Sequence, residues 1–265
     1  MTFRARALVG VAVLAWAVGS PHSSRAQVLE TETARSPRAG TFEFGSAFEF
    51  QTSAEGTELA VPLAVEYGWT DRLSLLVEPV IYTSIRPTIG PQATDFGDLE
   101  ATGFFRLRDE RGGYPAVAVA AEVKFATSEN PLISTGMTDG SGYLIASKRL
   151  GQFDVHANLG YTIFGQPPGA TLNNIFSGAL AAEFHAHRRL LIFGEMLGNT
   201  SSTPEGGGDQ PGNPNVVVPE AAGGELVGTL GLGVLPTDRF MVSLGLSYDN
   251  NHAWLIRPGL TYRMR

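Results

Sequence analysis

Cysteine is absent from this 265-residue chain, so neither disulfide bonds nor thiol chemistry is available to it. Basic residues are scarce as well: 19 lysines and arginines stand against 26 aspartates and glutamates, a formal net charge of −7. An acidic balance of this kind argues against nucleic acid as a partner. A chain without cysteine must be stabilised by a large core or by a closed network of hydrogen bonds.

Long hydrophobic runs are missing after the first twenty residues. Arg4 and Arg6 precede an apolar run, Ala7–Gly19, which is shorter than the ~20 apolar residues of a membrane-spanning helix. A basic start, a short apolar run and a small-residue cleavage site at Ala26 predict a secretory signal peptide over residues 1–26. Its removal leaves 16 basic against 26 acidic residues, so the net charge falls to −10.

The pattern that fills the rest of the chain is an alternation of apolar and polar residues, weaker in Asp95–Arg108 and least regular in Ser141–Leu150. In the stretch GQFDVHANLGYTIFG, Gly151–Gly165, the apolar side chains fall on every second position and polar ones lie between them. This period predicts a strand with one oily and one wet face. Twelve such segments follow one another: Gly40–Gln51, Thr57–Gly68, Arg72–Thr83, Asp95–Arg108, Tyr114–Phe125, Ser141–Leu150, Gln152–Phe164, Leu172–His185, Leu190–Asn199, Gly223–Leu235, Arg239–Asp249 and Ala253–Arg263.

These segments predict an all-β fold, a single antiparallel up-and-down transmembrane β-barrel of about 12 strands over residues 40–265. Each segment has roughly the 9–11 residues that a tilted membrane-crossing strand requires. Their number is even, and short connections alternate with mostly longer ones, as between the periplasmic and extracellular ends of bacterial barrels. Both ends would then be periplasmic, with residues 27–39 as a short periplasmic tail.

Aromatic residues lie near both ends of the predicted strands. Tyr67, Trp69, Phe153, Phe184, Phe240 and Tyr262 lie near the short connections, and Tyr161, Tyr248 and Trp254 near the longer ones. Two aromatic girdles of this kind mark the membrane interfaces of outer-membrane barrels. We therefore expect the apolar face to contact membrane lipids in the bacterial outer membrane.

Three stretches resemble a known family. GTFEFGSAFEF, AVEYGWTDRLSLLVEPVIY and DFGDLEATGFFRLRDE are similar to the outer-membrane transporters named after the phenol meta-degradation pathway, and Tyr67–Arg72 is the most specific part. The sequence departs from the family pattern after Leu99, where Phe104, Phe105 and Arg106 stand in place of an expected lysine. The resemblance implies a channel or transporter for hydrophobic or aromatic compounds, without naming the solute.

If the apolar face meets lipid, the alternate residues line the lumen, and most of the charged ones there are acidic. Glu78, Glu100, His156, Glu195 and Arg257 fall near mid-height on their strands and are our candidates for a constriction. An acidic lumen favours cations or neutral solutes over anions. The alternative is that these groups pair with one another and fill the lumen, because barrels of about eight strands are filled and those of about sixteen are open.

Two prolines interrupt neighbouring predicted strands. Pro62 and Pro79 lie at similar distances from the turn at Trp69–Asp71 and should be close together in one hairpin. Proline cannot donate to the strand ladder, and a closed barrel has no edge where this loss is harmless. The sequence predicts a local ladder break or bulge there, with a lateral opening for an apolar solute as the functional interpretation and a simple bulge as the alternative.

No arrangement of residues predicts catalysis. His156 and Asn158 share a face without a serine at the alternate position, and His185 and His187 flank a turn beside two arginines. A metal site needs further ligands, which the sequence does not nominate. We expect no catalytic residues, no metal and no cofactor.

The sequence therefore predicts an outer-membrane channel or transporter for passive uptake of small solutes through an acidic lumen, of undetermined oligomeric state. Two alternatives stay open. One is a plugged or structural barrel without transport, and the other is a secreted soluble β-sandwich binding protein with its aromatic residues inside.

Overall fold

A computed structural model describes residues 29–202 and 224–264, so the predicted signal peptide and most of the connection Thr200–Ala222 lie outside the described residues. Fourteen strands are present in this part of the chain. Their bounds are β1 Phe42–Ala47, β2 Glu49–Thr52, β3 Gly56–Gly68, β4 Leu73–Pro87, β5 Ala93–Asp95, β6 Leu99–Arg108, β7 Ala116–Phe125, β8 Asp139–Leu150, β9 Phe153–Ile163, β10 Ile175–His187, β11 Leu190–Asn199, β12 Leu226–Thr237, β13 Phe240–Asp249 and β14 Trp254–Met264.

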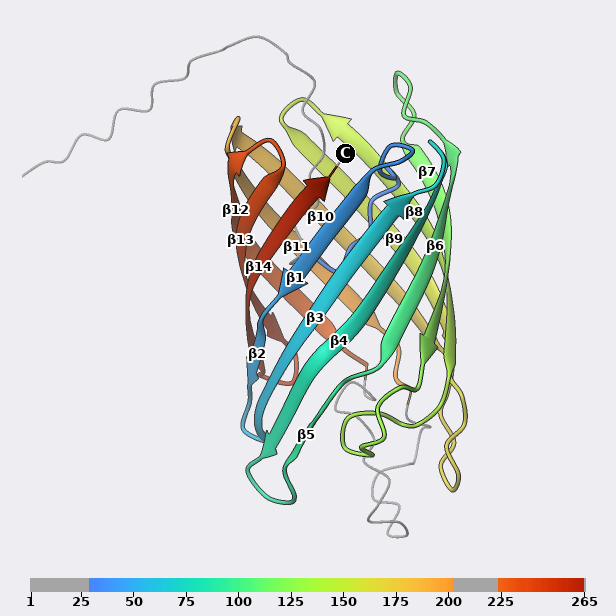
Figure 1. Ribbon diagram of the computed structural model, residues 1–265, viewed down its shortest axis with the longest axis vertical. Coiled ribbons are helices and arrows are strands. Elements are labelled where there is room, and N and C mark those ends of the chain that lie inside the picture. The colour runs from blue at the N-terminus through green and yellow to red at the C-terminus, as the bar shows by residue number, and fades with distance from the viewer. Residues whose placement is uncertain (1–28, 203–223, 265) are drawn as a thin grey trace, which may run out of the picture.

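The strands form one closed antiparallel barrel (Figure 1). From β6 to β14 each strand pairs with the next one in sequence, β3 pairs with β4, and β1 closes the barrel against β14 from Phe42↔Met264 to Ala47↔Gly259. β1 and β2 share the neighbours β3 and β14, and β5 and β6 share β4, so each pair is one interrupted barrel strand. The predicted twelve-stranded all-β barrel is confirmed.

The two ends of the barrel differ in their connections. Two-residue turns join β8 to β9, β10 to β11 and β12 to β13, and this turn end also carries the end of β14. The connections β7–β8, β9–β10 and β11–β12 at the opposite, loop end are longer. This alternation follows the predicted sorting of short and long connections.

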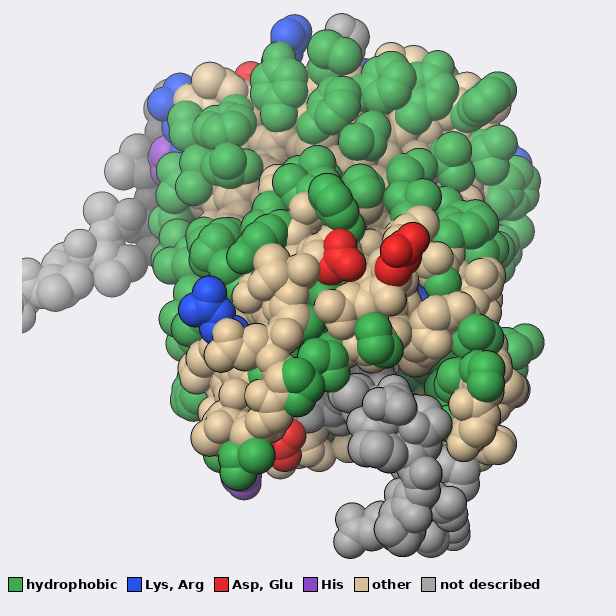
Figure 2. All heavy atoms as spheres, turned by 60° about the horizontal axis from the view of Figure 1, so that its bottom comes forward, with side chains coloured by type: hydrophobic (Ala, Val, Ile, Leu, Met, Phe, Trp, Pro, Cys, Tyr) green, Lys and Arg blue, Asp and Glu red, His purple; other side chains and the backbone are tan. Residues whose placement is uncertain are grey.

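Apolar side chains cover the outer wall of the barrel (Figure 2). In β9, Phe153, Leu159 and Ile163 are exposed, whereas Asp154, His156 and Asn158 are buried. Aromatic rings pack across neighbouring strands near both ends, as in the pairs Phe153–Phe184 and Tyr248–Trp254 with centroids 4.8 and 4.7 Å apart. The exposed aromatic residues overturn the sandwich alternative, which required them inside. Among the described residues, no helix is long and apolar enough to cross a membrane.

The ladder is irregular where the two prolines lie. Between β3 and β4 the register shifts between Ala60, which is paired with Thr83, and Pro62, which is paired with Val80. Pro79 is paired with Leu99 of β6. Ile81 and Tyr82 have no register partner in β3, β5 or β6, so the irregularity extends to both sides of β4.

Candidate functional site: the lumen and its N-terminal strap

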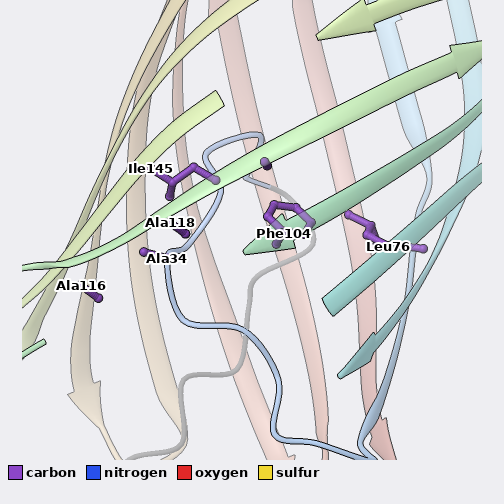
Figure 3. Close-up of a cluster of buried hydrophobic side chains, with 8 residues drawn as sticks. Ala34, Leu76, Phe104, Ala116, Ala118 and Ile145 are labelled. Atoms are coloured by element: carbon purple, nitrogen blue, oxygen red, sulfur yellow. The ribbon is translucent and has the colours of Figure 1, made fainter. Parts of the chain in front are cut away.

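The segment Leu29–Ser36, which we call the strap, lies inside the barrel. Ala34 is fully buried and packs in a cluster with Ala118 of β7 and Ile145 of β8 (Figure 3). The inward side chains of β7 at this level are alanines, which leave room for a second segment of chain. A short periplasmic segment over residues 27–39 stays a prediction, and the structure places residues 29–36 of this stretch in the lumen.

Backbone N–H groups of the strap bind to two buried side chains of the wall. The Glu195 carboxylate accepts hydrogen bonds from the N–H groups of Glu30 and Thr31, at 3.3 and 2.5 Å. The Oγ of Ser147 accepts from the N–H of Ala34 at 2.8 Å. Three strap donors therefore find acceptors on β11 and β8, because the strap, which bends at Thr31 and Ala34, has no strand partner of its own.

Asn158 of β9 binds the middle of the strap. Oriented so that both of its amide groups find partners, it accepts from the Glu32 N–H at 2.6 Å and donates to the Glu32 carbonyl oxygen at 3.0 Å. One side-chain amide thus pairs with the donor and the acceptor of a single residue. This is the hydrogen-bonding pattern that a neighbouring strand would offer.

Ion pairs hold the two ends of the strap. At its N-terminal end, Glu30 contacts Arg257 of β14 at 2.5 Å, and Arg257 also pairs with Glu49 at 2.9 Å. At its C-terminal end, Arg35 pairs with Asp154 of β9 at 2.9 Å and with Glu110 at 2.8 Å. The buried Arg257 and Asp154 are thereby paired with charges of opposite sign, as a low-dielectric interior requires, although Glu30 itself is exposed.

Glu110, in the connection between β6 and β7, accepts hydrogen bonds from the strap and from β8. It accepts from Arg35, from the Arg149 N–H at 3.1 Å, and from Lys148, whose Nζ lies 3.0 Å away. Burial acts to raise the pKa of this carboxyl, but the hydrogen bonds from Arg35, Lys148 and the Arg149 backbone outweigh it and lower the pKa below the ordinary value. Glu110 is therefore ionised at neutral pH and helps to hold Arg35.

Asp154, Glu183 and His185 form a cluster whose candidate ligand atoms all lie within 4.8 Å of one another. Asp154 already pairs with Arg35, with Arg149 and with His185, the last at 3.0 Å. Two guanidinium groups supply the positive charge that a metal ion would otherwise bring. The arrangement fits an ion-pair network rather than a metal site.

Of the five constriction candidates, Glu78 and Glu100 lie opposite each other on β4 and β6. Glu195 and Arg257 bind the strap. A hydrogen bond of 2.8 Å joins His156 Nδ1 to the Oγ of Ser147. The five side chains thus divide between an acidic pair on facing strands and residues at or next to the strap's binding site. The alternation predicted their inward direction, but the strap residues that bind Glu195 and Arg257 carry no such signal, because a non-strand segment has no register to predict.

Beside the strap, the lumen contains a cavity of about 640 Å³, which is lined in part by Leu29, Glu30 and Glu32 of the strap itself. Its lining includes the acidic residues Glu49, Glu78, Glu100, Glu122, Glu225 and Asp249, and Arg257 is the basic one among the described residues. Phe104, Tyr143 and Tyr248 also line it. The cavity is therefore acidic with aromatic surfaces in its wall.

Solved structures match this fold although no protein-family model and no curated protein matches the chain. The COG4313 outer membrane channel from Pseudomonas putida F1 matches with a TM-score of 0.68 at 9% identity, covering 89% of this chain and 100% of that one. The KdgM porin in complex with disordered oligogalacturonate matches at 0.57 and 8% identity over 84% and 99% of the two chains, and the NanC porin at 0.56 and 10% identity over 83% and 98%.

At identities this low, the likeness shows the fold and nothing more specific. The fold that these structures share with the chain is the closed antiparallel barrel of outer-membrane porins and channels. The family that the sequence resembles is not named among these matches.

Proposed function

We propose that this protein is a channel of the bacterial outer membrane for the passive uptake of small solutes. The observation that carries the proposal is a barrel with an apolar outer wall and a polar, hollow interior. An exposed apolar belt of this extent is incompatible with water and fits the hydrocarbon of a membrane. Export by the predicted signal peptide and contact with membrane lipids complete this proposal.

The charge of the lumen supports selectivity for cations or neutral solutes. Glu78 and Glu100, which are paired on neighbouring strands, both line the cavity beside the strap. Carboxylates that line a pore lower the energy of cations in it and raise that of anions. Phe104, Tyr143 and Tyr248 add aromatic surface. This surface, with the resemblance to the phenol meta-degradation transporters, supports hydrophobic or aromatic solutes as the finer substrate class.

A second candidate function is a plugged, structural barrel without transport. The strap favours it, because residues 29–36 occupy the lumen and are held at both ends by ion pairs. The two candidates differ in conductance, which has to be compared with the strap present and with the strap removed.

Conductance of the refolded protein in a planar bilayer, with a salt gradient across it, tests the channel. We expect stepwise currents whose reversal potential shows cation preference. The current steps should be larger in a variant lacking residues 29–36. The double variant Glu78→Gln, Glu100→Gln should lower the cation-to-anion permeability ratio several-fold, because it removes two facing carboxylates from the cavity.

The matched control is Glu129→Gln, which neutralises an exposed carboxylate outside the cavity and should leave the permeability ratio unchanged. Anion preference in the unmodified protein would overturn the proposed selectivity. Silence from folded protein both with and without the strap would establish the structural barrel instead.

A further inference from the structure

The lumen recognises its strap through backbone groups that every peptide carries. Glu195 accepts hydrogen bonds from the N–H groups of residues 30 and 31, and Ser147 accepts one from the N–H of residue 34. Asn158 accepts from the N–H of residue 32 and donates to its carbonyl oxygen. All three wall side chains are more than nine-tenths buried. They come from β11, β9 and β8, so the wall binds four of five successive residues from one side of the lumen.

From this geometry we infer that the lumen contains a binding site for a short peptide segment, which residues 30–34 fill in cis with bends at Thr31 and Ala34. The same site binds an equivalent peptide from solution once the strap has been withdrawn. This inference rests on the proposed function only in that a peptide from solution must reach the lumen through an open end of the barrel. It identifies a ligand class, short peptides, that the solute proposal does not contain.

Charges at the two ends of the site set the direction of the bound peptide. Arg257 receives a carboxylate at position 30, and Asp154 with Glu110 receives a guanidinium at position 35. The site therefore selects a peptide with an acidic residue followed five positions later by an arginine.

Space beside β7 and β8 sets the size of one further residue. Ala34 packs without exposed surface against Ala118 and Ile145 (Figure 3). A larger side chain at that position would overpack a cluster that is already closed. The fourth residue after the acidic one must therefore be small.

The test uses the full mature chain and a variant lacking residues 29–36, both refolded and checked for barrel formation. The probe is the capped peptide Leu-Glu-Thr-Glu-Thr-Ala-Arg, which copies residues 29–35. We expect it to block the conductance of the strapless variant in a saturable way and to leave the full chain unaffected. A capped peptide of reversed order, with the same composition, should block at least ten times more weakly.

Binding of a fluorescent form of the peptide, followed by anisotropy, gives a readout that does not depend on current. In the strapless background, Asn158→Leu should raise the dissociation constant tenfold or more, and Ser147→Ala provides a milder change should the first variant fail to fold. The matched control Ser243→Ala removes a buried inward hydroxyl from β13 and should bind as tightly as the strapless parent.

The outcomes separate this inference from the proposed function. A strapless variant that conducts but neither binds nor is blocked by the peptide overturns the peptide site and leaves the channel standing. Equal binding of the forward and reversed peptides, or undiminished binding by both wall variants, also overturns it. A strapless variant that binds the peptide but carries no current supports the site and contradicts the channel.

Discussion

Glu110 shows how a single carboxylate can hold a segment far from it in sequence. Its contacts with Arg35, Lys148 and the Arg149 N–H join the strap, β8 and the β6–β7 connection. Because these contacts depress its pKa, the stabilisation they provide is complete above the ordinary glutamate value of about 4.3 and is lost as the pH falls through the lower folded value. Residue-level electrostatics therefore make the strap weaker in acid.

We predict that Glu110→Gln increases the open time of the channel at neutral pH by up to about fivefold. A half-exposed ion pair contributes only about 0–1 kcal/mol, and Arg35 keeps its second partner, Asp154. The variant should also respond less than the parent when the pH is lowered from 5 to 3. Single-channel recording over this range measures both effects.

The control is Asp109→Asn, a neighbouring exposed carboxylate that pairs with Arg106 and does not contact the strap. It should keep the open time and the pH response of the parent. Other groups around Arg35, notably Asp154, Arg149 and His185, are common to all three proteins. An open time in Glu110→Gln that equals that of the Asp109→Asn control would show that Glu110 does not hold the strap.

At the scale of single elements, β4 is the least regular strand of the barrel wall. Its residues Ile81 and Tyr82 lack register partners on both sides, whereas the β8–β9 hairpin pairs without interruption from Gly140↔Ile163 to Leu150↔Phe153. Pro62 contributes by removing a donor from β3 at the shift. The local break was predictable from the prolines, but its extension across β4 to β5 and β6 depends on how three strands meet.

We predict that the amides of Ile81 and Tyr82 exchange their hydrogens at least about tenfold faster than those of Ala146 and Ala157, which pair with each other in the β8–β9 hairpin. Local opening requires fewer ladder bonds to break at an irregular site. Hydrogen–deuterium exchange of the refolded protein in detergent measures the difference. Equal protection at the two sites would mean that the bulge is as tightly held as the regular ladder.

For the whole molecule, the apolar belt bears on whether the outer wall of the barrel faces hydrocarbon or water. Leu159 is exposed near the middle of β9, and Leu150 is exposed at the turn end of β8. If the wall faces hydrocarbon, a charge at mid-depth is far more costly than one at the interface. Depth, rather than exposure alone, then governs the free energy of unfolding.

We predict that Leu159→Arg lowers the free energy of unfolding by about 2–4 kcal/mol, and that Leu150→Arg lowers it by only about 0–1 kcal/mol. Denaturant titration of protein folded into phospholipid vesicles measures both values. The two leucines have similar exposed fractions, 65% and 58%, so water-facing positions would respond alike. Equal small effects would therefore contradict a membrane-spanning wall.

The sequence by itself determined the barrel, because a period of two in twelve segments gives each strand one apolar face and one polar face, and the connections sort by length. It also determined that Glu78, Glu100, His156, Glu195 and Arg257 point inward. Only the tertiary structure decided what those side chains bind. The strap is a single irregular segment with no repeating partner, so its place in the lumen follows from contacts between residues as far apart as Thr31 and Glu195, which no local pattern encodes.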